Sequence, residues 1–212
     1  TNSNSDDPKV ATSFTITGDM TAFKLVGNHA GLYGIAIFNQ TQFNQFVSDM
    51  GNGIYNGSYE ASFAVTASNV SDVYVVNSVI LGAYNGILFE NCDRHIISNF
   101  VSGVPMYPIN VSGGTDGKIL NCFHNMATMV YMNGLATGQY SGISGNIGTN
   151  FRDRPIFIHA NYTKNAMLVN NFAYGIRAVL VAHGAKDLIA INTGADYLSP
   201  TDGSVIKFID ND

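Results

Sequence analysis

The chain is poor in charged residues and contains no tryptophan. Charged side chains make up 12% of its 212 residues, about half of the usual share. No run of about 18 apolar residues occurs, so we expect no membrane span. No basic run occurs either, so we expect no nucleic-acid partner. Zinc-ligand spacing, a phosphate-binding loop and a dinucleotide fingerprint are missing, and we therefore expect no metal site and no cofactor.

The residues that are abundant form strands and turns. The chain has 22 glycines, 13 phenylalanines and 11 tyrosines, and 46% of its residues are hydrophobic. Aromatic residues favour strands, and glycine favours turns. The composition therefore fits an all-β chain with many turns better than a helical one.

One asparagine recurs at a near-constant interval, and each copy ends a short apolar run. The intervals are 22, 22, 25, 24 and 22 residues, and the positions are Asn77, Asn99, Asn121, Asn146, Asn170 and Asn192. A fixed period of this size predicts a solenoid. Asparagine tolerates the left-handed backbone of a tight turn, and stacked coils let such side chains bond to one another as a ladder.

Two further series of apolar runs share this period. The first contains residues 87–90, 109–112, 130–133, 156–159, 179–182 and 206–209, and the second follows the ladder asparagines, as in residues 78–80 and 100–101. Three strands per coil follow from the three series. Cys92 and Cys122 fall at different corners of such a coil, so we expect two free, buried thiols.

Over about residues 53 to 209 this pattern resembles the right-handed parallel β-helix of the pectate-lyase-like superfamily. The resemblance implies an all-β solenoid of about seven to eight coils with three sheets. The series that contains Ile87 would form sheet one, and the runs before and after each asparagine would form sheets two and three. It also implies a polysaccharide groove along the outer face of sheet one, beside variable loops. The superfamily hosts many chemistries, so the fold alone selects none of them.

The chain divides into three predicted segments. Residues 1–10 are polar and are expected to form a flexible arm, residues 11–52 an irregular first coil with a capping helix, and residues 53–212 the regular β-helix. Phe43, Phe46, Val47 and Met50 follow helical spacing, which predicts one short helix near residues 41–50.

Strand alternation assigns two outward rows to sheet one. The predicted rows are Leu88, Asn110, Tyr131, Phe157, Leu180 and Lys207, and Glu90, Ser112, Asn133, His159, Ala182 and Ile209. The first row is too apolar for a solvated sheet, which indicates a partner surface. Either neighbouring subunits cover it, as in a trimer, or Tyr131 and Phe157 stack on sugar rings.

The candidate catalytic residues are His159, Arg154 and Glu90. His159, with Arg154 or Tyr131, is placed to abstract a proton beside a uronic-acid carboxylate, as a lyase requires. Its alternative role is a rim histidine bonded to a turn carbonyl. Glu90 is the only carboxylate on the predicted outer face, whereas glycosidases need two.

The candidate substrate-binding residues combine aromatic, basic and amide side chains: Tyr131, Phe157, Arg152, Asp153, Arg177, Asn133 and Tyr107. Arginines bind carboxylates or sulfates through paired hydrogen bonds. Alternatively, Asp153 pairs with the neighbouring arginines and only holds a loop. We assign Asp93 to turn chemistry, because an acidic or amide residue recurs in that turn, at Asp72, Asp116, Asn165 and Asp187.

The leading functional hypothesis is an extracellular or virion-associated carbohydrate-active β-helix domain that binds or cleaves a polysaccharide. If it is an enzyme, it is a polysaccharide lyase or a glycoside hydrolase. The rival hypothesis is a trimeric fibre or tailspike-like module without catalysis in this segment. A third is that the chain is part of a larger enzyme. The expected partners are a polysaccharide or oligosaccharide, and further copies in a homo-oligomer or a neighbouring domain.

Overall fold

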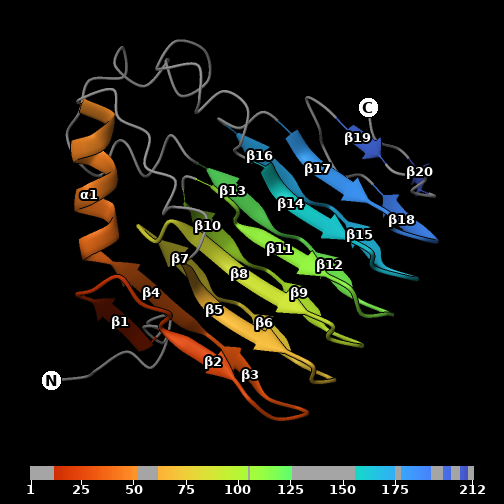
Figure 1. The fold of residues 1–212 in the computed structure, drawn as a ribbon, viewed down its shortest axis with the longest axis horizontal. Coiled ribbons are helices and arrows are strands. Elements are labelled where there is room, and N and C mark those ends of the chain that lie inside the picture. Colours follow the sequence, from red (N-terminus) through yellow and green to blue (C-terminus); the bar gives the residue numbers. More distant parts are fainter. Residues whose placement is uncertain are drawn as a thin grey trace, which may run out of the picture.

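The chain forms a parallel β-solenoid with three sheets (Figure 1). The computed structural model describes residues 12–51, 62–104, 106–125, 156–174, 178–191, 198–201 and 206–209. Every strand pairing in these residues is parallel, and strands that follow each other in the chain belong to different sheets. The predicted fold class, with three sheets and one short helix, is confirmed for the described residues.

We name the sheets A, B and C. Sheet A stacks β1 (Thr12–Ile16), β4 (Ile35–Asn39), β7 (Val79–Leu81), β10 (Val101–Gly103), β13 (Phe123–Asn125) and β16 (Phe172–Tyr174). Sheet B stacks β2 (Phe23–Leu25), β5 (Phe63–Ser68), β8 (Asn85–Glu90), β11 (Ile109–Ser112), β14 (Ile156–Asn161), β17 (Ala178–His183) and β19 (Leu198–Thr201). Sheet C stacks β3 (Gly31–Tyr33), β6 (Tyr74–Val76), β9 (Ile96–Ser98), β12 (Lys118–Leu120), β15 (Met167–Val169), β18 (Leu188–Ile191) and β20 (Ile206–Ile209).

Sheets B, C and A correspond to the predicted sheets one, two and three. Five coils are complete among the described residues, since β2–β4, β5–β7, β8–β10, β11–β13 and β14–β16 each supply one strand to every sheet. Strands β17 to β20 extend sheets B and C beyond the fifth coil. The predicted count of seven to eight coils is therefore too high for the described part of the chain.

One coil of the excess comes from a misread interval. β11 pairs directly with β14, with Ile109 opposite Ile158, and β12 pairs directly with β15. The Asn170 amide donates to Asn121 Oδ1 at 3.1 Å across a separation of 49 residues. Neither the run that ends at Asn146 nor residues 130–133 supply a strand between these neighbours, although both were predicted to do so. Their own structure lies outside the described residues.

The asparagine ladder exists over the remaining coils. Asn77, Asn99, Asn121 and Asn170 all have positive φ, between 48° and 53°, at the corner that joins sheet C to sheet A. Asn99 Nδ2 donates to Asn77 Oδ1 at 2.9 Å. The predicted ladder is thus confirmed for these four positions and wrong for Asn146, while Asn192 lies outside the described residues.

The helix α1 (Gln40–Gly51) occupies the predicted place and leaves the solenoid between β4 and β5. The Gln42 N–H donates to Asn39 Oδ1 at 2.9 Å, so Asn39 caps the first turn. Phe43 and Phe46 are buried, which docks the apolar stripe of the helix against the coils. The connection from sheet A to sheet B also contains residues 126–155 at the fourth coil, and this is the connection predicted to vary most.

Two C-terminal strands differ from the prediction. β20 pairs with β18 in sheet C, with Lys207 opposite Ile189, although residues 206–209 were predicted in sheet one. In β17, Leu180 and Ala182 lie opposite Ile158 and Ala160, so the predicted phase is wrong by one residue. The run from Val179 to Ala182 is apolar throughout, and a run without alternation does not reveal its phase.

Inside the coils, the core follows the predicted inward rows over the first strands of sheet B. Ile87, Phe89, Ile109 and Val111 are at most 2% exposed. Ile158 continues the row of Ile87 and Ile109 and is fully buried. The stacked apolar rows fix the outer face of sheet B, because successive residues of a strand point to opposite sides.

Candidate functional site

The outer face of sheet B is polar where its side chains are described. The register forms one outward row from Lys24, Thr66, Leu88, Asn110, His159, Val181 and Ser199, and a second from Ser68, Glu90, Ser112, Asn161 and His183. Lys24, Ser68 and Glu90 are exposed, and Thr66, Leu88, Asn110 and Ser112 are half-buried.

The predicted apolar strip on this face is therefore wrong. Tyr131 lies outside the described residues, Phe157 lies two residues before the row position that His159 occupies, and Lys207 belongs to sheet C. Leu180 lies opposite Ile158, in the register of the inward row. The prediction failed because it assumed equal coils through the insertion at residues 126–155.

Glu90 and His159 were predicted to share one outward row, three coils apart. The register instead puts His159 opposite Asn110, in the row of Leu88, while Glu90 lies opposite Ser68 and Ser112 in the other row. β14 lies two strands from β8, which is about 10 Å at the usual strand spacing. Among the described outward side chains of sheet B, Glu90 is the one carboxylate.

Tyr107 lies at the edge of sheet B where the chain arrives from sheet A. Its N–H donates to Asn85 Oδ1 at 3.0 Å, and Asn85 is fully buried. Burial raises the pKa of the Tyr107 hydroxyl, so this group remains protonated at neutral pH. The other predicted candidates Tyr131, Asn133, Arg152, Asp153, Arg154 and Arg177 lie outside the described residues, and β14 places Phe157 and His159 by their backbone alone.

The corner between sheets B and C carries a row of charged and amide residues. Asp72, Arg94, Asp116, Asn165 and Asp187 occupy equivalent positions with φ between 50° and 59°. The predicted recurring turn is thus confirmed, with Arg94 at the equivalent position of the second of these coils. Arg94 donates to both oxygens of Asp72 at 2.7 Å. This hydrogen bond lowers the pKa of Asp72 more than desolvation raises it, and the charges of Arg94 and His29 lower it further.

Asp93 has the turn role that its sequence position predicts. Its Oδ1 accepts the Thr115 N–H of the next coil at 2.9 Å. Asp93 also pairs with Ser71 of the preceding coil through an isolated parallel bridge. The carboxylate therefore joins neighbouring coils at the surface of the corner.

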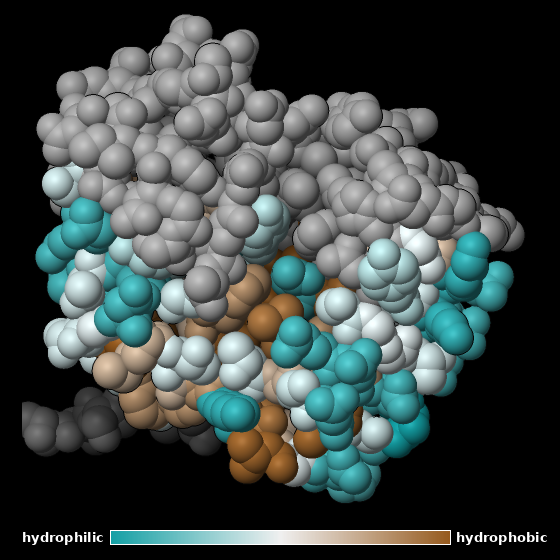
Figure 2. Space-filling view, viewed as in Figure 1, coloured by the Kyte–Doolittle hydropathy of each residue, from teal (hydrophilic) through white to brown (hydrophobic). Residues whose placement is uncertain are grey.

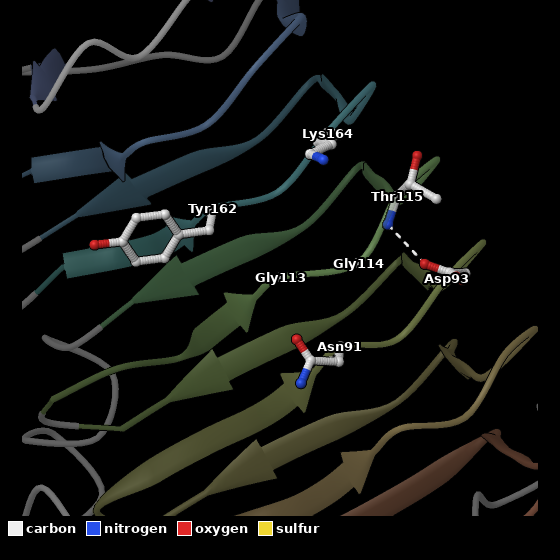
Figure 3. A pocket seen from close by; sticks show the side chains of 7 residues that line it. All are labelled: Asn91, Asp93, Gly113, Gly114, Thr115, Tyr162 and Lys164. Carbon is white, nitrogen blue, oxygen red and sulfur yellow. Dashed lines mark hydrogen bonds between the residues drawn. The ribbon is translucent and has the colours of Figure 1, made fainter.

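A surface depression at this corner was not predicted (Figure 3). It measures about 580 Å³ and is lined by Asn91, Asp93, Gly113, Gly114, Thr115, Tyr162 and Lys164. One feature of the sequence could have indicated the depression. The 22-residue period puts Gly113 where the two preceding coils have Asn69 and Asn91.

Two histidines are buried inside the solenoid. Burial lowers the pKa of His124 to about 3, and Ser102 Oγ lies 2.9 Å from its Nδ1. Burial also lowers the pKa of His95, whose Nδ1 lies 2.9 Å from the Cys92 carbonyl oxygen. Both imidazoles are therefore neutral at neutral pH and serve the core rather than the outer face of sheet B.

Cys92 and Cys122 are free and buried, as predicted. Within the described ranges, no three His, Cys, Asp or Glu side chains gather in a way that would hold a metal ion. No helix of the described part is long and apolar enough to cross a bilayer. No protein-family model matches the chain, and no curated protein shows significant similarity to its sequence.

Proposed function

We propose that this protein is a glycan-binding β-solenoid that holds a polysaccharide along the outer face of sheet B. The observation that supports this function is the pair of polar outward rows, in which hydroxyl, amide and carboxylate groups such as Thr66, Asn110, Ser112 and Glu90 recur from strand to strand. Neighbouring strands lie about 4.8 Å apart. A repeating series of donors and acceptors suits a ligand that is itself a repeating chain of hydroxyl groups.

Binding is preferred over hydrolysis because glycosidases need two carboxylates about 5 to 10 Å apart. Sheet B offers only Glu90 among its described outward side chains. If the protein cleaves its ligand, we propose an elimination with His159 as the base and Arg154 or Tyr131 beside it. Arg152, Arg154 and Arg177 would then hold acidic groups of the polymer. We propose in addition that the chain is a member of the pectate-lyase-like superfamily.

The polar face also bears on the rival fibre hypothesis. That hypothesis drew its main support from an apolar outward row, which a neighbouring subunit would cover. The described row contains the polar residues Lys24, Thr66 and Asn110 beside Leu88, so it lacks the apolar character on which that support depended. The glycan hypothesis needs only the face that is present, and it implies a location where polysaccharides occur, outside the cell or on a virion.

Affinity electrophoresis in gels that contain neutral or acidic polysaccharides tests the proposal. Ser112→Val removes a hydroxyl from the outer face of sheet B, and Ser98→Val makes the same change on sheet C. Both serines are half-buried and lie at the ends of strands, and valine keeps a strand-forming residue. A lost hydrogen bond of about 1 kcal/mol weakens binding about fivefold. We expect this loss for Ser112→Val and none for Ser98→Val, and equal effects would contradict the assignment of the face.

Cleavage is followed separately, by measuring new reducing ends and unsaturated products. We expect Glu90→Gln to leave the amounts of both unchanged. A cleavage activity that Glu90→Gln abolishes, while binding in the gel persists, would overturn the preference for binding over hydrolysis.

A further inference from the structure

The corner between sheets B and C has a second row of residues with positive φ, which begins at Asn69 and Asn91. A notch interrupts this row. Asn69 and Asn91 are bonded to each other, with 3.3 Å from Nδ2 to Oδ1, and the next coil has Gly113 at this position. Gly113 and Gly114 have φ of 71° and 77°. A Cβ on Gly113 would collide with Asn91 Oδ1, and a Cβ on Gly114 would collide with the Cys92 carbonyl. The absence of both side chains therefore lets the Asn91 amide and the Cys92 backbone pack directly against the floor of the notch.

Tyr162 forms one wall of this notch. It occupies the same row one coil beyond Gly113, and its ring packs against Gly184 of the following coil, where a Cβ would lie 2.6 Å from the ring. The residue is nevertheless 64% exposed. Figure 3 shows the ring extending to the left of the two glycines, with Thr115 and Asp93 to their right and Lys164 above them on the coil of Tyr162. An aromatic face that is held in place and open to solvent is suited to stacking on a sugar ring.

The lining of the notch also carries two charges that do not pair with each other. Parallel bridges join Thr115 to Lys164 and Lys164 to Lys186, and Asp93 Oδ1 accepts the Thr115 N–H. Asp93 and Lys164 are thus two coils apart, about 10 Å at the usual strand spacing. The ion pairs found within the described residues join Asp72 to Arg94 and to His29. Lys164 takes part in neither, so its ammonium group is open to an anionic ligand.

We propose that this notch binds a sugar that carries a carboxylate. The Lys164 ammonium pairs with the carboxylate, the Tyr162 ring stacks on a face of the pyranose, and Asn91 and Asp93 bond its hydroxyl groups. A volume of about 580 Å³ falls within the range of small-molecule sites. The inference rests on the proposed glycan function for the class of ligand, but the notch is separate from the rows on the face of sheet B.

Calorimetric titration with glucuronate, and with glucose as the neutral match, tests the proposal on the whole chain. We expect glucuronate to bind at millimolar concentration at least tenfold more tightly than glucose. Lys164→Met should weaken glucuronate binding at least tenfold. Lys186→Met, which removes the exposed lysine of the same row one coil away, should change it less than twofold. Equal binding of both sugars, or equal losses in both variants, would overturn the proposal.

A second variant closes the notch without removing a charge. Gly113→Asn continues the asparagine row, and asparagine accepts a positive φ, although the terminal Oδ1 of Asn91 must move aside. We expect glucuronate binding to disappear while the circular dichroism spectrum is retained. Glucuronate binding that survives Gly113→Asn in the folded protein would place the sugar elsewhere. Polymer binding that is weakened in Ser112→Val and unchanged in Lys164→Met separates the face from the notch, so either proposal can fail alone.

Discussion

The two corners that bound sheet C place the same demand on the backbone and meet it with different side chains. At the corner from sheet C to sheet A, Gly34 has positive φ in the first coil and asparagine has it in the next four, and the asparagine amides bond across coils at 2.9 and 3.1 Å. The corner from sheet B to sheet C has positive φ at Asn69, Asn91, Gly113, Tyr162 and Gly184 in turn. Asparagine is kept in the coils that bond to one another through this side chain. The residue type varies more where the side chain faces solvent or a ligand.

The inner sides of the two corners differ in the same way. Behind the ladder, the Cys122 N–H donates to Asn171 Oδ1 at 3.1 Å, and Asn171 Nδ2 donates to the Ile119 carbonyl at 3.0 Å. Behind the other corner, Thr163 Oγ1 is buried without a hydrogen-bond partner in the described part of the chain. The ladder corner is thus the more completely bonded of the two, which fits a structural role. The other corner carries the notch.

The largest expected effect on the free energy of unfolding comes from the buried residue that follows the left-handed asparagine at each corner. Phe100, which follows a ladder asparagine, and Cys92, which follows Asn91, are both at most 1% exposed. Phe100→Ala should lower the free energy of unfolding by about 3–5 kcal/mol, and Cys92→Ala by about 1–2 kcal/mol, because fewer buried atoms are lost. Urea denaturation measures both. Val101→Ala, at a residue 39% exposed, is the control and should cost less than about 1 kcal/mol. Equal losses for Phe100→Ala and Cys92→Ala would contradict the expectation that the ladder corner gains more stability from packing than the other corner.

A smaller effect on the free energy of unfolding is expected from Asn99 in the ladder and from Asn91 at the other corner. Asn99→Ala loses the 2.9 Å amide bond and puts alanine at φ 48°, for a total of about 2–3 kcal/mol. Asn91→Ala has the same backbone cost, but its bond to Asn69 is longer, at 3.3 Å, so we expect about 1–2 kcal/mol. Asn99→Gly isolates the amide bond, since glycine accepts the positive φ, and should cost about 1 kcal/mol. Chemical denaturation that ranks Asn91→Ala above Asn99→Ala would reverse the comparison.

The smallest effect is expected from the ion pair between Asp72 and Arg94, because both groups are at the surface. The pKa of Asp72 is lowered in the folded protein, so the pair contributes stability above the unfolded pKa of this carboxyl and loses it as pH falls through the folded pKa. Arg94→Met should therefore lower the melting temperature slightly at pH 7, and the difference from wild type should shrink as pH falls below 3.8. Added salt should also reduce it.

Lys118→Met makes the same change of charge at an exposed position of sheet C and is the matched control. Its difference from wild type should not follow the titration of Asp72. Parallel pH profiles for Arg94→Met and Lys118→Met, recorded by thermal unfolding, would show that net charge rather than the pair causes the effect.

Local patterns predicted most of the elements. The 22-residue spacing of Asn77, Asn99 and Asn121 identified the ladder, because asparagine is one of the few residues that accept the left-handed region. The apolar spacing of Phe43 and Phe46 placed α1 within a residue of each observed end. Alternation identified the buried rows of β8 and β11 correctly. Each of these features depends on residues that are close in the chain.

The candidate site was predicted less well, because its composition depends on pairings across long separations. Ile109 lies opposite Ile158 rather than a residue about 22 positions later, and this one pairing moved His159 into another row. The depression was missed because its walls come from three coils, with Asn91 on one side of Gly113 and Tyr162 on the other. Asp93 was the exception, since its turn role was visible in the recurring acidic positions.

The sequence by itself determined the coil: its approximate length, its three strands, and the corner where the ladder asparagines take a positive φ. Those properties follow from the conformational preferences of single residues and from the two-residue period of a strand. Only the tertiary structure decided which coils are neighbours, since β13 pairs with β16 although residues 126–155 lie between them in the chain. The free-energy cost of a longer loop rises only slowly with its length, so hydrogen-bond register and core packing, rather than sequence distance, select the partner strand.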